Sequence, residues 1–295
     1  MTNFKYPKMA AAHDFCMVGA MIGDISGSRY EFLERKIRRK PESLIGAPDF
    51  FTDDTVLTYA VAMGIWKGMQ KIDRASLLTD TDAQSAVENE IARSLKNYAR
   101  RYPKAGYGGR FREWVNGDSM EPYNSFGNGS AMRVSFAGWY ARSLEEALTL
   151  AKLSARVTHS HEFGIKGAEA VAGCIYPLRT AHGKEEVRAY ASKYYDLDFT
   201  LEEIRPTYAF DETCEGSVPQ AIAAFLENDS FEDVIRSAIY VGGDSDTIAA
   251  IAGSIAEACY DIPNDLIERA TSKLDLALKS DVRTISEILR EKISQ

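Results

Sequence analysis

The sequence predicts an all-α fold: one compact, mostly helical domain. Apolar residues recur at helical spacing through most of the chain, and the alternating patterns typical of β-strands are scarce. Many of the expected helices carry Ala and Gly on one face, which allows close packing. No repeat with a period of about 20–50 residues is visible, and no linker rich in Pro, Ser or Gly divides the chain. We therefore expect a single domain over residues 1–295.

The expected helices can be placed in order from their periodicity and from their capping residues. For example, Thr and Asp side chains precede the helix at 56–69, and Asp229 or Ser230 can cap the helix at 230–239. The segment 196–219 is rich in acids and aromatics and contains Pro206, so we expect it to be irregular. The expected helices are 11–22, 56–69, 83–102, 144–154, 163–178, 184–194, 220–227, 230–239, 248–260, 266–280 and 285–293.

The bulk composition favours a cytoplasmic enzyme or binding protein. The net charge of −8 argues against general binding to nucleic acid through its phosphates. No apolar run approaches the length of a membrane span, and the apolar stretch near the N-terminus is too broken for a signal peptide. The cysteines are widely separated, which favours free thiols over a disulfide framework or a zinc site. They are Cys16, Cys174, Cys214 and Cys259.

The segment 242–247 places two carboxylates and two hydroxyls where a helix is expected to begin. Asp244 and Asp246 are two positions apart and do not share a helix face, so they converge only if the backbone turns. The paired glycines at 242 and 243 permit such a turn. Oxygen ligands packed this closely suit a hard cation, Mg²⁺ above all. By itself, the segment is explained equally well as a plain helix N-cap.

A second acidic cluster, 52–55, has the same pattern of carboxylates and hydroxyls at a helix start. A helix start needs only one cap, so two carboxylates in each cluster exceed what capping requires. If the fold brings the clusters together, four carboxylates repel one another unless they are neutralised. A pair of divalent cations would supply the counter-charge, and two-metal sites also activate water. The two clusters together therefore favour a binuclear metal centre.

The glycine-rich segment 127–130 and the histidines at 159 and 161 are further candidates. Glycine-rich turns expose backbone N–H groups that can hold phosphate, although this segment alone is explained as well by an ordinary tight turn. Two histidines at i and i+2 suit a loop that reaches one ligand. We expect His159 to contact a ligand and His161 to be a structural donor; the alternative is that both are structural.

Glu31 lies between Tyr30 and Phe32. A carboxyl group among aromatic rings can have a raised pKa and serve as an acid or base. A solvated surface glutamate explains the local sequence equally well.

Taken in order, these segments resemble the ADP-ribosylglycohydrolases, the group that includes the dinitrogenase reductase-activating glycohydrolase. The resemblance runs through almost the whole chain. It implies an orthogonal all-α bundle with a binuclear magnesium centre, in which manganese sometimes replaces magnesium. The matching segments are 23–32, 52–55, 125–133, 158–161, 215–219 and 242–247.

The resemblance also implies an activity and a set of site residues. The family removes ADP-ribose from a modified side chain by hydrolysing the bond at the anomeric carbon of the distal ribose. Three acids take catalytic positions, with Glu31 near the scissile bond as acid, base or gate; they are Glu31, Asp54 and Asp244. The implied metal ligands are Thr52, Asp53, Asp54, Asp244, Asp246 and Thr247. The implied residues around the diphosphate and distal ribose are Gly127, Asn128, Gly129, Ser130, Met132 and His159.

The acceptor and the role of the segment 196–213 stay open at the level of sequence. Our first hypothesis is an ADP-ribosylated arginine, with a serine-linked or free ADP-ribose derivative as the alternative. A catalytically silent, crystallin-like binding member and a different two-metal hydrolase are less favoured. We expect a monomer that binds neither nucleic acid nor membranes. The aromatics in and just before this stretch either contact the ligand or pack the loop against the helices; they are Tyr194, Tyr195, Phe199, Tyr208 and Phe210.

Overall fold

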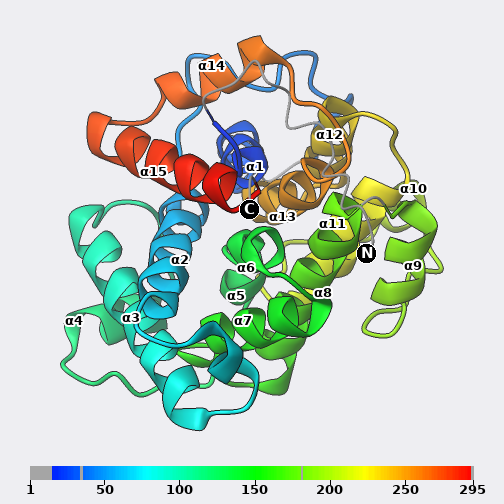
Figure 1. Ribbon diagram of the computed structural model, residues 1–295. Coiled ribbons are helices and arrows are strands. Elements are labelled where there is room, and N and C mark those ends of the chain that lie inside the picture. The colour runs from blue at the N-terminus through cyan, green and yellow to red at the C-terminus, as the bar shows by residue number, and fades with distance from the viewer. Residues whose placement is uncertain (1–14, 34–35, 181, 294–295) are drawn as a thin grey trace.

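Helices make up all of the regular secondary structure in the computed structural model, which describes residues 15–33, 36–180 and 182–293 (Figure 1). Within those residues the only β-type pairing is one isolated bridge between Gly127 and Thr213. The predicted all-α class is therefore confirmed. Buried apolar side chains from most of the helices form one continuous core cluster.

The elements are named in chain order. They are α1 (Gly19–Gly27), α2 (Asp53–Met69), the 3-10 helix η1 (Arg74–Leu78), α3 (Thr81–Arg101), α4 (Gly109–Asn116), α5 (Gly129–Met132), α6 (Ser135–Tyr140), α7 (Leu144–Arg156), α8 (Glu162–Arg179), α9 (Lys184–Ala191), α10 (Leu201–Ile204), α11 (Cys214–Leu226), α12 (Phe231–Val241), α13 (Ser245–Ala256), α14 (Asn264–Ser272) and α15 (Leu276–Ile293).

Three glycines of α1 let this helix lie directly against α13 in the centre of the molecule (Figure 1). Gly19, Gly23 and Gly27 repeat every four residues and so occupy one face of α1. A Cβ added to any of them would come within 2.0–2.5 Å of a backbone atom of α13. Because only glycine permits this approach, the backbones of the two helices are close enough for Asp24 and Asp246 to meet at one end of the pair.

The first expected helix, 11–22, is wrong in its position. Residues 11–14 lie outside the described part of the chain, and 15–18 are not helical. Met17 has a φ of 58°, a left-handed conformation that a right-handed helix does not contain. The helix begins instead at Gly19 and continues to Gly27, beyond the expected end, because its glycines pack against α13.

Several other boundaries also differ from the expected ones. The helix α11 begins at Cys214, well before residue 220, because the Thr213 side chain accepts a hydrogen bond from the Gly216 N–H and caps the helix there. Within the segment expected to be irregular, 201–204 also form the short helix α10, which Thr200 caps. Near the C-terminus, the break falls between α14 and α15 at 273–275 and not at 281–284.

The described residues contain no helix that is both long and apolar enough to cross a membrane. The four cysteines are free thiols, as predicted, and only one of them is exposed, Cys259.

Candidate active site

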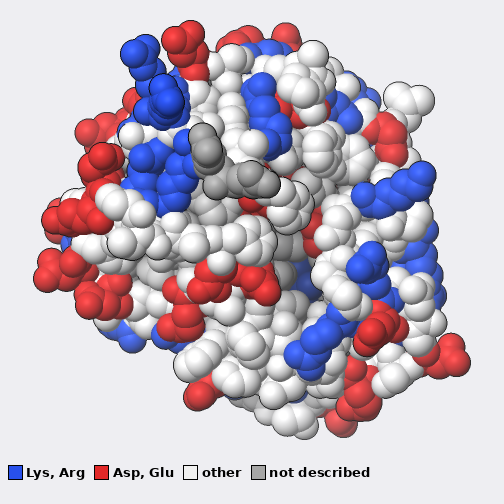
Figure 2. Space-filling view, turned by 180° about the vertical axis from the view of Figure 1, so that it is seen from behind, with Lys and Arg blue, Asp and Glu red and all other residues white. Residues whose placement is uncertain are grey.

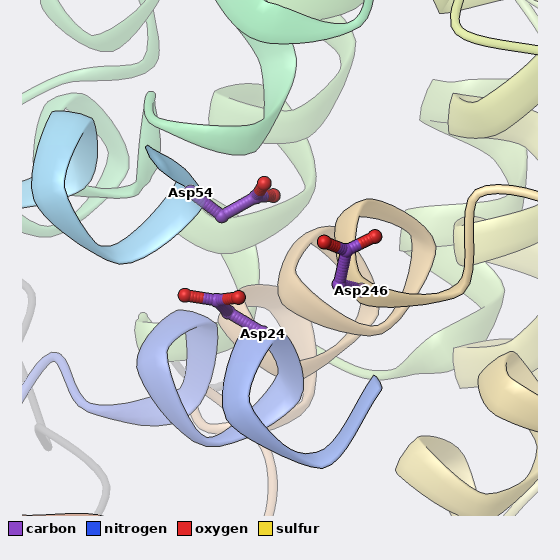
Figure 3. A group of neighbouring side chains, drawn as sticks. All are labelled: Asp24, Asp54 and Asp246. Atoms are coloured by element: carbon purple, nitrogen blue, oxygen red, sulfur yellow. The ribbon is translucent and has the colours of Figure 1, made fainter. Parts of the chain in front are cut away.

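Carboxylates from three helices converge at the centre of the molecule. Asp24 comes from α1, Asp54 from the first turn of α2 and Asp246 from the first turn of α13 (Figure 3). Each contributes an oxygen atom, and these atoms all lie within 4.8 Å of one another. Glu31, Asp244 and Asp246 form a second group that meets the same limit. Asp246 therefore belongs to both groups and joins them.

The two acidic clusters predicted from the sequence meet in the fold. The Thr247 hydroxyl donates a hydrogen bond to Oδ2 of Asp54 at 3.2 Å, which connects the start of α13 to the start of α2. Asp53 lines the same cavity, although it is in neither carboxylate group.

Asp244 occupies the N-cap position of α13, but its side chain makes no capping hydrogen bond. Its Oδ2 instead accepts a hydrogen bond from the side-chain amide of Asn128 at 2.7 Å. The two preceding glycines have φ values of 84° and 74°, so the predicted glycine turn is present. A plain N-cap therefore does not account for Asp244, whose carboxylate is turned toward the other acids.

Asp24 is a central residue of the site that the sequence-based site prediction missed. Its carboxylate accepts hydrogen bonds from the Thr52 N–H at 2.9 Å, the Thr52 hydroxyl at 2.8 Å and the Thr55 N–H at 3.1 Å, and from the Thr55 hydroxyl. Asp24 thus ties the start of α2 to α1 and holds Asp54 in place. The only signal in the sequence was its place in a matching segment. An acid in the middle of an apolar helix is neither a cap nor part of a periodic pattern, so no local rule marks it as a site residue.

Burial raises the pKa of every acid in the cluster, and neighbouring carboxylates raise the pKa of most of them further. Burial raises the pKa of Asp24 to about 6, against hydrogen bonds from Thr52 and Thr55 that lower it. Burial and the Asp244 charge raise the pKa of Glu31 to about 7. Burial and the Asp24 charge raise the pKa of Asp53 to about 8. The pKa values of Asp54 and Asp246 are raised well above the ordinary aspartate value, first by burial and then by neighbouring carboxylates.

These residues fit a hard divalent cation. Oδ1 of Asp54 is buried and has no hydrogen-bond partner among the described residues. The surrounding donors are carboxylate and hydroxyl oxygens, the ligands that Mg²⁺ prefers. A positive ion among them would stabilise the ionised carboxylates, which burial and mutual repulsion disfavour.

The acids open onto a cavity of about 490 Å³. The space-filling view in Figure 2 shows a hollow near the middle of one face, with acidic and basic side chains around it. Among the predicted site residues, most line this cavity, namely Glu31, Asp53, Asp54, Gly127, Asn128, Gly129, Met132, His159, Asp244, Asp246 and Thr247.

Two predicted site residues do not line the cavity. Thr52 is buried behind Asp54, where its hydroxyl bonds Asp24. Ser130 is fully buried, and its hydroxyl donates to the carbonyl of Gly164 at 2.7 Å. Both side chains therefore support the walls of the site.

The glycine-rich segment is tied directly to the acids. Asn128 uses its side-chain amide nitrogen to bond both Ser217 and Asp244, at 2.9 and 2.7 Å. The Asn128 N–H also donates to the carbonyl of Glu212 at 2.8 Å. This loop therefore has a fixed position beside the carboxylates.

The two histidines differ in their surroundings. His159 is buried and lines the cavity. His161 is the N-cap of α8, and its Nδ1 accepts a hydrogen bond from the Phe163 N–H at 3.2 Å. The structural role of His161 is thus confirmed, although the residue accepts the bond and does not donate it.

Of the predicted aromatics in and just before the segment 196–213, one lines the cavity and the others pack against the core. Phe210 lines the cavity and stacks on Phe32, with ring centroids 6.0 Å apart. Phe32 is 79% exposed, so this pair stands at the cavity mouth. The remaining aromatics pack against the core, namely Tyr194, Tyr195, Phe199 and Tyr208. Three further lining residues lie outside every segment that the sequence singled out as a site, namely Arg110, Tyr123 and Glu212, and Arg133 was inside a matching segment but was not predicted as a site residue.

The chain is similar to known proteins over most of its length. The sequence matches the profile of the family described as ADP-ribosylglycohydrolase over residues 14–294. The ADP-ribosylhydrolase ARH3 of Homo sapiens is 28% identical over 321 residues, which cover 83% of this chain and 84% of that protein. The ADP-ribosyl-[dinitrogen reductase] glycohydrolase of Rhodospirillum rubrum is 24% identical over 291 residues, which cover 90% of this chain and 91% of that protein.

A solved structure titled "ADP-ribosylglycohydrolase-related protein complex" has a similar fold. Its TM-score is 0.61 at 21% sequence identity, and the alignment covers 92% of this chain and 96% of that chain. The fold type that the resemblance implied is confirmed. Because the family profile matches nearly all of the sequence, this chain belongs to the ADP-ribosylglycohydrolase family.

Proposed function

We propose that this protein hydrolyses the bond between the distal ribose of an ADP-ribosyl group and a modified protein side chain, and that it requires divalent cations, Mg²⁺ first. One observation carries the proposal: two groups of carboxylates, joined through Asp246, face the same cavity as the glycine-rich loop and His159. Family membership supports the reaction class.

The acids are the residues that would hold the cations. The proposed ligands are Asp53, Asp54, Asp244, Asp246 and Thr247, which line the cavity. Thr52, whose hydroxyl is bonded to Asp24 behind Asp54, is assigned to the support of these ligands. Asp24 is close enough to join the ligands but already accepts four hydrogen bonds from the start of α2, so we assign it mainly to positioning Asp54. Bound cations of this kind orient sugar hydroxyls and make a water molecule more nucleophilic.

The other residues of the chain bind and orient the substrate. The loop at 127–130 and His159 form the wall that we assign to the diphosphate and the distal ribose. Asn128 connects this wall to Asp244, so that binding of the nucleotide and the position of the carboxylate depend on each other. Orientation of this kind favours the oxocarbenium-like state through which glycosidic bonds break.

Glu31 is our candidate for proton transfer at the scissile bond. It is half-buried in the cavity wall, and burial beside Asp244 raises the pKa of Glu31 to about 7. A group with such a pKa can both hold and release a proton near neutral pH.

ADP-ribosyl-arginine is our first candidate substrate, because the cavity mouth suits a cation. Glu31 and Glu212 supply acids, and the pair Phe32–Phe210 supplies aromatic rings. A guanidinium group pairs with carboxylates and stacks on aromatic faces. A serine-linked substrate has no charge at this position and gains nothing from these groups.

The test is release of free ADP-ribose from proteins modified on arginine or on serine, with Mg²⁺ and with a chelator. We expect release from arginine-linked substrate that stops when the chelator is added. Release from serine alone would overturn the acceptor assignment, and release unaffected by chelation would overturn the metal requirement. No release from either substrate would leave a silent binding member as the better explanation.

We also propose that the protein acts in the cytoplasm, because its free thiols suit a reducing compartment, and that it acts as a monomer. Light scattering of the purified chain and fractionation of the cells that make it would test the two parts separately.

A further inference from the structure

A buried chain of polar groups leads from Arg133 to His159. Arg133 caps the end of α5 and is fully buried, although the cavity reaches its side chain. Its Nη2 donates to the Thr158 hydroxyl at 2.7 Å and to the Ser154 carbonyl at 3.3 Å. The same Thr158 hydroxyl oxygen lies 2.8 Å from Nδ1 of His159. Two successive hydrogen bonds therefore connect the guanidinium group of Arg133 to the imidazole ring of His159 in the cavity wall.

The chemistry of these groups decides where the proton of His159 resides. A guanidinium group only donates hydrogen bonds, so one lone pair of the Thr158 oxygen is occupied by Arg133. The Thr158 proton is then left to donate, and Nδ1 of His159 is an acceptor within hydrogen-bond distance. An imidazole that accepts at Nδ1 and is neutral carries its proton on Nε2. The Tyr123 hydroxyl also lies within hydrogen-bond reach of Thr158. In the arrangement proposed below, Tyr123 donates to the second lone pair of the Thr158 oxygen, so that the Thr158 proton stays directed at Nδ1 of His159.

The surroundings of His159 keep its ring neutral. Burial lowers the pKa of His159 well below the ordinary value, and the positive charges of Arg133 and Arg110 lower it further. No acid is among the groups that shift it. At neutral pH this ring is therefore a neutral donor and not an imidazolium.

Nε2 of His159 faces the glycine-rich loop. A Cβ added to Gly129 would lie 3.0 Å from Nε2, and one added to Gly127 would lie 3.6 Å from it. In the described part of the chain, no hydrogen-bond acceptor is recorded for this nitrogen. The two glycines leave space beside Nε2, and that space belongs to the cavity.

We propose that Arg133 and Thr158 are positioning residues: they fix His159, which the proposed function already assigns to the diphosphate wall, as a neutral Nε2–H donor directed at an anionic oxygen of that group. The ligand part rests on the proposed function. The proton assignment rests only on the contacts within the protein and is tested without a ligand.

The first experiment is nitrogen NMR of the Mg²⁺-loaded, ligand-free protein labelled with ¹⁵N-histidine. The chain has four histidines, so the His159 signals are identified by their loss in His159→Gln. We expect Nδ1 of His159 to resonate as an unprotonated nitrogen and Nε2 as a protonated one at neutral pH. A protonated Nδ1, or a mixture of the two tautomers, would overturn the proposal.

The second experiment removes the Thr158 hydroxyl, which joins Arg133 to His159. Thr158→Val keeps the shape of the side chain but deletes the hydroxyl, whereas Thr158→Ser restores it. We expect Thr158→Val to lose the single tautomer and to bind ADP-ribose about tenfold more weakly, the usual effect of losing one hydrogen bond to a charged group. Thr158→Ser should restore both. The control Ser160→Ala deletes the partly exposed hydroxyl of a neighbouring residue, which bonds only Asn124 in the described structure.

The outcomes separate this proposal from the proposed function. An unchanged tautomer and unchanged affinity in folded Thr158→Val would overturn the positioning role. If the wild-type protein shows the expected tautomer but does not bind ADP-ribose, the proposed function and the diphosphate contact fail and the proton assignment survives. If Thr158→Val does not fold, the spectrum of the wild-type protein still decides the tautomer.

Discussion

Asp246 is the single residue on which the candidate site depends most, because it belongs to both carboxylate groups. We expect Asp246→Asn to lower turnover by more than about 100-fold, since even residues that only support a metal ligand cost about 10–100-fold when changed. The fold should persist, because the substitution removes one of several repelling charges and keeps the shape. Turnover and thermal unfolding should be measured together.

Asp261→Asn is the matched control for that substitution, because Asp261 is exposed and lies outside the site. Normal turnover in Asp246→Asn would show that Asp246 serves only the structure of α13. Loss of turnover in both variants would point to a general loss of stability.

The raised pKa values predict how the stability of the metal-free protein depends on pH. The pKa values of Asp24, Glu31 and Asp53 are raised to about 6, 7 and 8, above an unfolded value of about 4. A group whose pKa is raised on folding stabilises the folded state most below its unfolded pKa, and this stability is lost as the pH rises through the folded pKa.

In a chelator, we therefore expect the melting temperature to fall between about pH 5.5 and about pH 8. Mg²⁺ should reverse this fall, and should stabilise more at the higher pH, because a cation binds the deprotonated acids. The measurement is thermal unfolding at both pH values with Mg²⁺ and with a chelator. A metal-free protein that becomes more stable as the pH rises would contradict the raised pKa values.

At the scale of elements, the approach of α1 to α13 decides whether the acids meet. A Cβ at residue 23 would lie 2.0 Å from the carbonyl oxygen of Ala249, a backbone atom that cannot move aside by itself. We expect Gly23→Ala to force the two helices apart and to lower the free energy of unfolding by about 3 kcal/mol, at the upper end of typical overpacking costs. Because Asp24 and Asp246 would separate, Mg²⁺ should also stabilise this variant less.

Gly46→Ala is the control, because a Cβ there meets only ordinary contacts, at 3.6 Å or more. Urea unfolding of the two variants with and without Mg²⁺ measures both effects. If Gly23→Ala unfolds like the wild-type protein, the close approach of the helices is not essential to the site.

For the whole molecule, the site links segments that are far apart in the chain. Asp24, Asp54 and Asp246 belong to three helices that meet only through tertiary contacts (Figures 1 and 3). A ligand that binds the folded state stabilises the segments that carry its contacts against local opening. We expect Mg²⁺ to slow amide hydrogen exchange at the first turns of α2 and α13 and to leave α9 unchanged. Uniform slowing, or none at the two helix starts, would argue against a cation at this position.

The residue types of the site and the class of the fold could be predicted from the sequence, because both are expressed locally. Helical periodicity and caps such as Thr52 and Ser230 depend on neighbours a few positions away, so most helices were found. The paired acids at 52–55 and 242–247 exceed what a cap needs, and this excess is visible without a structure.

Local patterns misplaced the elements whose cause is not local. The left-handed Met17 stops the helix expected at 11–22, and the contact with α13 sets where α1 ends. His161 was taken for a donor, whereas the orientation of the α8 start makes it an acceptor. Such details depend on which groups the fold places opposite one another.

By itself, the sequence determined the helical class, the two acidic clusters and the chemistry that they suit. The tertiary structure alone decided that Asp24 completes the carboxylate group and that Arg133 reaches His159 through Thr158. The physical reason is the same for both. A single polar residue among apolar ones has no period and no cap to reveal it, and its role comes from burial beside residues that are distant in the chain.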